Sequence, residues 1–430
     1  MSNRIAFAFV FLAIGLHLLR NLSLTMYAAI YLFAMLIVVV GAVTNRRAGE
    51  ARLFSIPITI WVVVAIYGSI VTLIFSGGVA AAFGLVRFLF AAPLLLALAY
   101  FTRTHSDLIR HLQVMAVFVA ACAASIPLQI ATGAVSWFAE DSVRGSFERY
   151  GSLAGSLTSF GIIVGCFIAL TLSIRMRFDW LLVSVMLIGI MSSLSKAAIA
   201  NAIIGLLVGT WINRRRLGRV ALTLVPLVAV VALATTLAPS LYGRFQTVLM
   251  SFGVQQNPEL RPNYDSSVSD SVIDRLTTLP LKNFEALNDL NSPLAYLSGG
   301  GFGMAATALV PRSASLAPMA HNQYAELMTV FGLVGGLLLI LFMAYTGFNL
   351  VKRSEESPLA EATAWSYAIF LVNGLFANGT VYQPVSGAFF FLAIFVAFCD
   401  LKLLIPNARD ESMAETLATK RRKYGRVTHL

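Results

Sequence analysis

Residues 317–350 read APMAHNQYAELMTVFGLVGGLLLILFMAYTGFNL, a short polar turn that opens onto a long apolar run. The run is long enough to cross a bilayer as a helix, which takes about 20 mostly apolar residues. Asn322 or Gln323 can begin that helix, because a side-chain amide satisfies the free N–H groups of a first turn. His321 stands directly before them, and Glu326 is the only acid within the run. The stretch therefore predicts a membrane span over 324–350 with a histidine at its mouth.

The rest of the chain continues this pattern. Of the 430 residues, 58% are hydrophobic and only 12% are charged, whereas a soluble protein carries about 25% charged residues. We therefore expect an all-α, polytopic membrane protein. Apolar runs of helical length predict about twelve transmembrane helices, over residues 5–19, 25–43, 54–75, 79–101, 112–131, 156–174, 180–194, 197–212, 220–238, 324–350, 363–377 and 385–404.

The positive charges indicate an orientation. With the N-terminus in the cytoplasm, most of the 31 lysines and arginines fall in inner loops or in the tail, as the positive-inside rule requires. The formal net charge of +11 is thus a topology signal, which argues against nucleic acid as a partner and places the basic tail at anionic membrane lipid. We expect both termini in the cytoplasm. In a two-membrane bacterium, the protein would lie in the inner membrane and its outer segments would face the periplasm.

This topology divides the chain into four parts. Spans one to nine occupy 1–238, a large periplasmic loop occupies 239–320, spans ten to twelve occupy 321–404, and a basic cytoplasmic tail occupies 405–430. Within the loop, apolar residues at 273, 276, 284 and 287 predict short amphipathic helices over the bundle, with Thr278 and Pro280 placed to begin the second.

Some cations oppose the topology, because they fall outside or within the membrane: Arg20, Arg87, Arg144, Arg149, Lys196, Arg244, Arg261, Arg275, Lys282 and Arg312. An excess of positive charge on the outer face favours an anionic substrate there. Arg87, in the middle of a predicted span, is compatible with a bridge between helices or with a residue on a substrate pathway.

Two other residues also have two readings. His321 is either an interface histidine that bonds a backbone carbonyl or part of a cavity at the membrane edge. The cavity would also explain Glu326, because an ionisable residue in a span costs about 3 kcal/mol unless it finds a partner or water. Lys196 either extends its ammonium to the membrane surface or binds a phosphate.

The sequence predicts neither a metal nor a cofactor. The other histidines and the acids of the loop have no metal-ligand spacing with His321, and the three cysteines are expected to be buried thiols. SGGGFGMAA (298–306) contains GxGxxA without the strand that a dinucleotide site needs. We interpret it as a glycine turn whose backbone approaches a ligand or a lipid headgroup.

These residues resemble a known family. His321 followed by Gly332 is similar to the HX10G motif of O-antigen ligases, and Arg275 with Leu279 (RLTTL) is similar to their RX3L motif. SGGGFGM resembles the glycine stretch that precedes the family's histidine, and the long outer loop between spans nine and ten also matches. SSLSKAAIA (192–200) resembles a further family stretch, with Lys196 where the family usually has arginine.

The resemblance implies a GT-C-like, metal-independent, inverting glycosyltransferase. Its donor would be a glycan on undecaprenyl diphosphate, and its acceptor either lipid A-core, for an O-antigen ligase, or a second lipid-linked repeat, for a Wzy-type O-antigen or exopolysaccharide polymerase. A lipid-glycan transporter is a more distant alternative. The implied site residues are His321 and Arg275 as catalytic residues, Lys196, Arg244 and Arg149 as diphosphate ligands, and Asn322, Glu326 and Gly332 as supports.

Overall fold

The structure, a computed structural model, describes residues 2–44, 54–133, 142–144, 147–155, 157–174, 176, 178–193, 195–212, 273–305, 309–311, 315–377 and 379–405. The predicted ninth span (220–238) and the predicted tail from 406 onward lie outside the described residues, as does Arg244.

The described part is helical apart from one small hairpin, in which β1 (Ser142–Arg144) pairs antiparallel with β2 (Phe147–Arg149). Four of its helical stretches are long and apolar enough to cross a membrane: Leu24–Thr44, Ser55–Phe101, His105–Thr132 and Gln323–Ser354. Several apolar helices are shorter. This confirms an all-α membrane protein in its broad class. The longer helices are α1 (Asn3–Gly15), α2 (Leu24–Thr44), α4 (Ser55–Leu89), α5 (Pro93–Phe101), α6 (His105–Thr132), α7 (Leu157–Ile174), α8 (Asp179–Ser192), α9 (Lys196–Ile212), α15 (Gln323–Ser354), α16 (Pro358–Gly374) and α17 (Pro384–Phe398).

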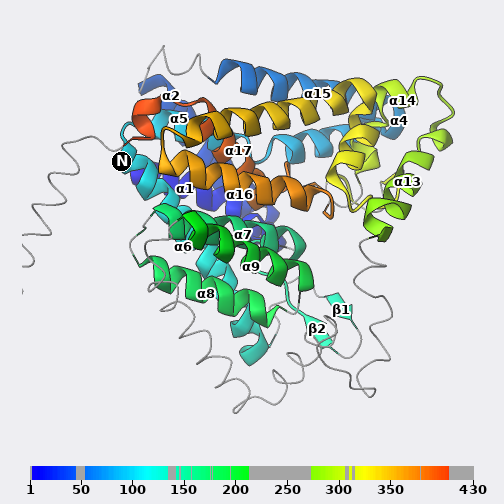
Figure 1. Cartoon of the computed structure of the whole chain (residues 1–430). Coiled ribbons are helices and arrows are strands. Elements are labelled where there is room, and N and C mark those ends of the chain that lie inside the picture. The colour runs from blue at the N-terminus through cyan, green and yellow to red at the C-terminus, as the bar shows by residue number, and fades with distance from the viewer. Residues whose placement is uncertain are drawn as a thin grey trace, which may run out of the picture.

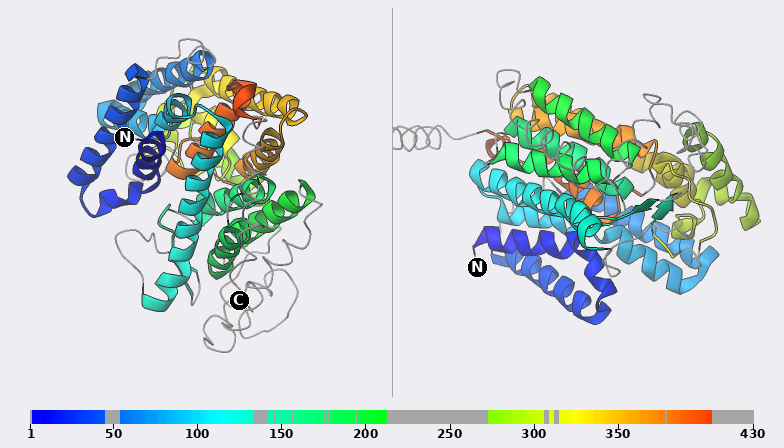
Figure 2. Two further views of the ribbon diagram at one scale, coloured as in Figure 1. Left: turned by 90° about the vertical axis from the view of Figure 1, so that its left-hand side faces the viewer. Right: turned by 90° about the horizontal axis from the view of Figure 1, so that it is seen from below.

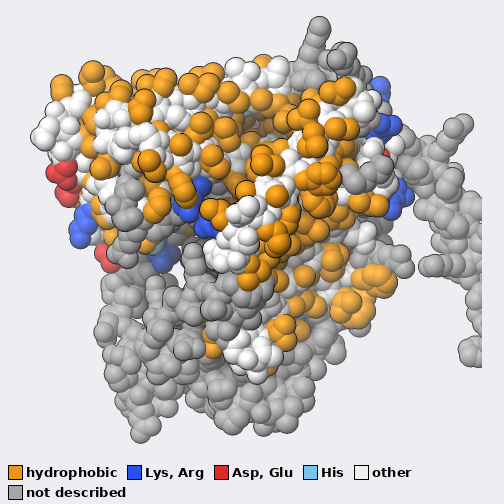
Figure 3. Space-filling model, turned by 180° about the vertical axis from the view of Figure 1, so that it is seen from behind, with side chains coloured by type: hydrophobic (Ala, Val, Ile, Leu, Met, Phe, Trp, Pro, Cys, Tyr) orange, Lys and Arg blue, Asp and Glu red, His pale blue; other side chains and the backbone are white. Residues whose placement is uncertain are grey.

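Two short helices and the hairpin lie at one end of the bundle. Figure 1 shows α13 (Thr278–Glu285), α14 (Ala295–Ser298) and the β1–β2 hairpin opposite the N-terminus. We call this end the α13 end and the other the amino-terminal end. The α1–α2 pair and the α8–α9 pair lie on opposite flanks (Figure 2). Between the two ends, one face of the molecule is broadly hydrophobic (Figure 3).

Two features of the packing make the bundle a rigid frame. α17 is buried along its length, with Phe389 and Phe390 fully enclosed. α7 and α9 pack backbone to backbone, since a Cβ added at Gly205 would lie only 2.1 Å from the carbonyl oxygen of Gly165. Such close approach is typical of small residues between membrane helices. It fixes the start of α9, where Lys196 lies, relative to the core.

α4 is a helical hairpin that turns at Gly77, whose φ of 83° is non-helical. The Trp61 and Phe88 rings stack with their centroids 4.3 Å apart, although a straight helix would separate these residues by about 40 Å. The two arms therefore run antiparallel. They correspond to the predicted spans 54–75 and 79–101, and the second span continues through α5.

α15 reverses in the same way at Gly332, where φ is 67°. Gln323 Nε2 lies 3.7 Å from Met343 Sδ, whereas 20 residues of straight helix would separate them by about 30 Å. The prediction of one continuous span over 324–350 is therefore wrong in its first part. An apolar run with a permissive glycine satisfies a span pattern whether the helix continues or turns back.

Candidate functional site

The first arm of α15 (323–331) is one half of a loop that enters the bundle from the α13 end and returns. Asn283 Nδ2 donates to the Pro318 carbonyl at 2.7 Å, and Thr329 Oγ1 donates to Asn283 Oδ1 at 2.5 Å. Pro318 and Thr329 thus flank one buried amide. The chain descends from Pro318 to Gln323 and climbs back as a helix. Irregular backbone at such depth occurs where it is buried in protein or lines a cavity.

His321 lies at the bottom of this loop. Its φ is 49°, and among the described residues only two other non-glycine residues have positive φ. A side chain in this region of backbone space costs energy, and such strain persists where the surroundings hold it, often at a functional site. His321 is partly exposed, whereas Asn322 and Gln323 beside it are buried.

The helix that follows begins as the sequence predicts. Asn322 Oδ1 accepts hydrogen bonds from the backbone N–H groups of Tyr324, at 3.0 Å, and Ala325, at 3.1 Å. Glu326 lies in the first turn and is only 1% exposed. The helix N-terminus brings a partial positive charge to the position of His321. Helix ends of this kind favour an anionic group.

The glycine stretch before the loop packs against protein rather than facing a ligand. Gly300 N donates to the Thr329 carbonyl at 2.9 Å, and Phe302 N donates to Thr72 Oγ1 of α4 at 2.6 Å. A Cβ on Gly332 would lie 2.1 Å from the Leu297 carbonyl oxygen. The interpretation of SGGGFGMAA as a ligand-approaching turn is therefore corrected. These glycines and Gly332 let the stretch hold the reversal of α15.

A second segment, between α16 and α17, meets the arm. Val381 N donates to Gln323 Oε1 at 3.1 Å, and Tyr324 hydroxyl donates to the Leu371 carbonyl at 2.7 Å. Arg275 is partly buried, and its Nη1 donates to the Phe376 carbonyl at 3.1 Å. The Arg275 guanidinium is thereby linked to the same inter-helix segment that contacts the first arm of α15.

Buried hydroxyl groups lie in this segment and in the first turn of α17. Thr380, Tyr382 and Ser386 are at most 2% exposed, and their hydroxyls find no hydrogen-bond partner among the described residues. Leaving a buried polar group without a partner costs about 1–3 kcal/mol. Water or a polar ligand is the usual solution, so the segment favours a wet interior beside the arm.

The predicted diphosphate ligands are placed only in part. Lys196 is the first residue of α9, and Asn201 one turn later accepts from Asn373 Nδ2 at 2.7 Å near the end of α16. This places the Lys196 backbone at the α13 end. Arg149 ends β2 at that end. The side chains of Lys196 and Arg149 lie outside the part of the chain that the structure describes. Among the described residues, no group of three His, Cys, Asp or Glu side chains could hold a metal ion.

Two residues that shape the site were not predicted as site residues, although Gln323 was considered as a possible helix start. Asn283 and Gln323 are fully buried and carry the contacts that shape the loop. The spacing of Leu276, Pro280, Asn283 and Leu287 repeats every three or four residues, which puts Asn283 on the face of α13 that includes buried Pro280. A polar residue on such a face was an available signal.

The site therefore combines a partly exposed imidazole in strained backbone, a helix N-terminus and a linked guanidinium. This chemistry suits binding an anion while moving or orienting a proton. Comparison of the chain with protein-family models and with curated proteins finds no match.

Proposed function

We propose that the protein is an inverting glycosyltransferase that moves a glycan from undecaprenyl diphosphate to an acceptor at the periplasmic face, most simply as an O-antigen ligase with lipid A-core as acceptor. The proposal starts from the HX10G and RX3L resemblance of His321, Gly332, Arg275 and Leu279. The observation that carries it furthest is the loop that enters the bundle and holds His321 at positive φ.

The topology we propose has twelve spans, a cytoplasmic amino-terminal end and a periplasmic α13 end. In support, Arg103, Arg110, Lys352 and Arg353 lie in or next to connections at the amino-terminal end, as the positive-inside rule requires. The large loop between spans nine and ten would then stand over the outer leaflet. There it would meet a lipid-linked donor.

In the proposed reaction, an acceptor hydroxyl attacks the anomeric carbon of the donor sugar. A new glycosidic bond forms, and the bond from that carbon to the diphosphate oxygen breaks. Undecaprenyl diphosphate leaves with the electron pair, and the configuration inverts. Negative charge grows on the leaving group, and fixed cations stabilise such charge most in a site that excludes water.

Arg275 is the cation with the best support, because its bond to the Phe376 carbonyl holds it against the segment that contacts the arm. Lys196 and Arg149 would add charge from the same end, and Arg244 completes the proposed set. Lys196 would act as a point charge, since an ammonium lacks the planar fork of arginine.

His321 would receive the acceptor's proton or orient its hydroxyl. An imidazole can do either near neutral pH. Asn322 and Gly332 would support it by fixing the helix start and the reversal, and Glu326 by its buried position one turn away. Diphosphate is a good leaving group, so orientation alone would supply much of the acceleration.

A Wzy-type polymerase is the second candidate, because it uses the same donor and the same leaving group. The two differ only in the acceptor. A lipid-glycan transporter is a third, for which a polar interior such as that around Thr380 and Tyr382 would be equally suitable.

One experiment separates these functions. Purified protein in lipid nanodiscs is incubated with undecaprenyl-diphosphate glycan, with and without lipid A-core, and products are resolved by mass. Core-dependent capping is expected for the ligase. Chain lengthening without core would indicate the polymerase instead, and the absence of any covalent product would contradict a glycosyltransferase.

A further inference from the structure

A short uncharged segment of the predicted outer loop carries exposed apolar side chains. Residues 290–311 contain no charged residue. Within this stretch, Leu294, Tyr296 and Leu297 are 62%, 50% and 50% exposed, whereas Ala295 between them is fully buried. These residues are α14 and the residue before it. Exposed apolar side chains that gather in this way mark a surface for another protein or for a membrane.

α14 lies beside the first arm of α4, at a level deeper than the turn of that hairpin (Figure 1). The Tyr67 hydroxyl donates to the Ser298 carbonyl at 2.8 Å. Gly77, where α4 turns, follows Tyr67 by ten residues, about 15 Å along the arm. From Ser298 the chain runs outward along this arm, since Phe302 N donates to Thr72 Oγ1. The helix is therefore at the deep end of the glycine stretch.

The first arm of α4 shows how far the hydrocarbon extends at this end. Three apolar side chains between Tyr67 and the turn are more than half exposed: Ile70, Leu73 and Ile74. The arm is part of a stretch apolar and long enough to span a membrane, and exposed apolar side chains of such a span face lipid. Because these three residues lie farther out than Tyr67, the hydrocarbon extends beyond the level of α14.

The second arm of α15 supplies the other side of the same surface. A Cβ on Gly332 would lie against the Leu297 carbonyl oxygen, so α14 packs where this arm begins. The arm opens with Leu333 and Val334, which are both exposed. The exposed side chains of α14 are therefore continuous with a surface that faces lipid on two neighbouring spans.

The backbone of the segment suits a place in hydrocarbon, where polar groups need partners within the protein. Five of its N–H groups donate to carbonyl oxygens of the chain: those of Ala295, Leu297, Ser298, Gly299 and Gly300. The Tyr296 hydroxyl donates to Asn288 Oδ1 at 2.6 Å, in the short helix η4 (Asn288–Leu290). Charged residues resume at Asp289. A tyrosine with its hydroxyl at such a polar boundary is typical of a membrane interface.

We propose that α14 is embedded in the hydrocarbon region of the leaflet at the α13 end, with Leu294, Tyr296 and Leu297 as the side chains that contact lipid. This part of the predicted loop 239–320 is then held in the leaflet rather than above it. Because α14 packs on Gly332, the leaflet covers the element that holds the reversal of α15. The proposal does not depend on the proposed glycosyl transfer.

Nitroxide labelling of the full-length protein in lipid nanodiscs tests the proposal. Leu294→Cys and Leu297→Cys carry the label on α14. Asp289→Cys, at an exposed position of η4, is the control in water, and Leu337→Cys, on the second arm of α15, is the control in lipid. The three native cysteines are buried, so wild type gives the background of labelling. Gel filtration and thermal melting select folded variants, and Tyr296→Cys replaces a leucine variant that does not fold.

Collisions of the label are measured with oxygen, which concentrates in hydrocarbon, and with a water-soluble nickel chelate. We expect nickel collisions at positions 294 and 297 to be about tenfold less frequent than at 289, because hydrocarbon excludes polar solutes, and oxygen collisions to be as frequent as at 337. Nickel collisions as frequent as at 289 would overturn the proposal, because α14 would then stand in water. Infrequent collisions with both reagents would also overturn it, because another segment of the chain or a second copy would then cover α14.

Discussion

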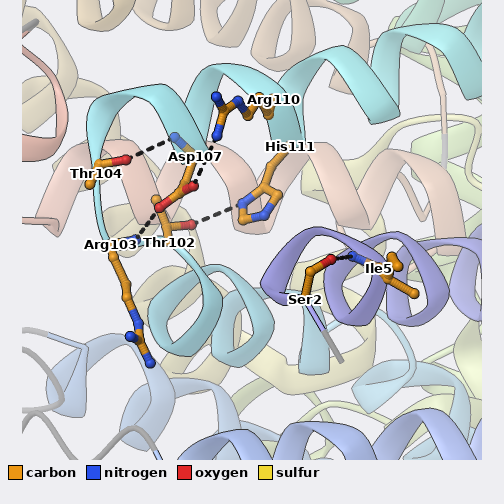
Figure 4. A network of polar contacts seen from close by, with 8 residues as sticks. All are labelled: Ser2, Ile5, Thr102, Arg103, Thr104, Asp107, Arg110 and His111. Carbon is orange, nitrogen blue, oxygen red and sulfur yellow. Dashed lines mark hydrogen bonds and ion pairs between the residues drawn. The ribbon is translucent and has the colours of Figure 1, made fainter. Parts of the chain in front are cut away.

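The two ends of the bundle each hold a histidine beside a polar network, but the networks are built differently. At the amino-terminal end, Thr102 Oγ1 lies 3.1 Å from His111 Nδ1, Asp107 N donates to Thr104 Oγ1 at 3.1 Å, and Arg110 pairs with Asp107 at 3.7 Å (Figure 4). All of these partners lie within ten residues of one another in sequence.

At the α13 end, the partners come from far apart. Asn283 joins Pro318 to Thr329, Gln323 bonds Val381, and Arg275 bonds Phe376. His111 is fully buried and stacks on Phe7 with ring centroids 4.0 Å apart, while His321 is partly exposed and its backbone is strained. The local network begins a helix. The long-range network combines buried amides with strained backbone at His321. Strain of this kind is expected at a functional site.

Substitution of the two histidines should give the largest contrast. We expect His321→Gln to lower the transfer rate by about 10²–10⁴-fold, the range for loss of a general acid–base group, with little change in thermal stability. His111→Gln should lower the thermal midpoint, because it removes a ring that stacks on Phe7, and should leave the rate per folded molecule unchanged. Both are measured on purified, monodisperse protein. Similar transfer rates of the two variants would contradict a functional role for His321 that His111 does not share.

The two reversal glycines provide a matched pair for stability. Gly332→Ala places a methyl group against the Leu297 carbonyl at positive φ, so we expect a loss of about 2–4 kcal/mol. Gly77→Ala has the same strain but meets no atom within 4 Å, and about 1 kcal/mol is expected. The thermal midpoints of the Gly332→Ala and Gly77→Ala variants are compared by melting in detergent. An equal shift in both variants would show that the glycine stretch does not hold α15.

Asn283→Ala and Thr104→Ala compare a long-range bridge with a local cap. Asn283→Ala removes the amide that binds the Pro318 carbonyl, while the Thr329 hydroxyl keeps the Glu326 carbonyl as an acceptor. We expect a cost of about 1–3 kcal/mol and a slower transfer, because the loop is held less firmly. Thr104→Ala removes an N-cap worth about 1 kcal/mol and should leave transfer unchanged. Transfer rates and melting are measured together. A normal rate in Asn283→Ala would mean that His321 is positioned without this bridge.

Sequence patterns predicted the elements of this fold better than their directions. Apolar runs located most of the described helices to within a few residues, and the Asn322 cap and the helix beginning at Thr278 are confirmed. The reversal at Gly332 escaped prediction, because an uninterrupted apolar run is equally compatible with a straight span. It is fixed by contacts with Leu297 and Gly299, which are distant in sequence.

The candidate site divides in the same way. His321 and Arg275 were identifiable because a charged or titratable residue is conspicuous in a membrane setting. Asn283 was detectable only as a polar residue on the predicted buried face of its helix, and Gln323 carried no signal for its bond to Val381. The roles of both amides depend on partners 35 to 58 residues away. Local signals reveal helix starts, whereas a site assembled from separate segments requires the fold.

The central claim is that His321 and Arg275 serve one reaction centre although they lie on different elements. The most direct test is a double-mutant cycle on the single-turnover transfer rate, with Arg275→Lys, His321→Gln and the double variant, chosen so that residual activity stays measurable. Residues that act as a unit lose far less in combination than the product of their separate losses, so we predict a double variant within about threefold of the slower single variant. Losses that multiply would contradict a shared site.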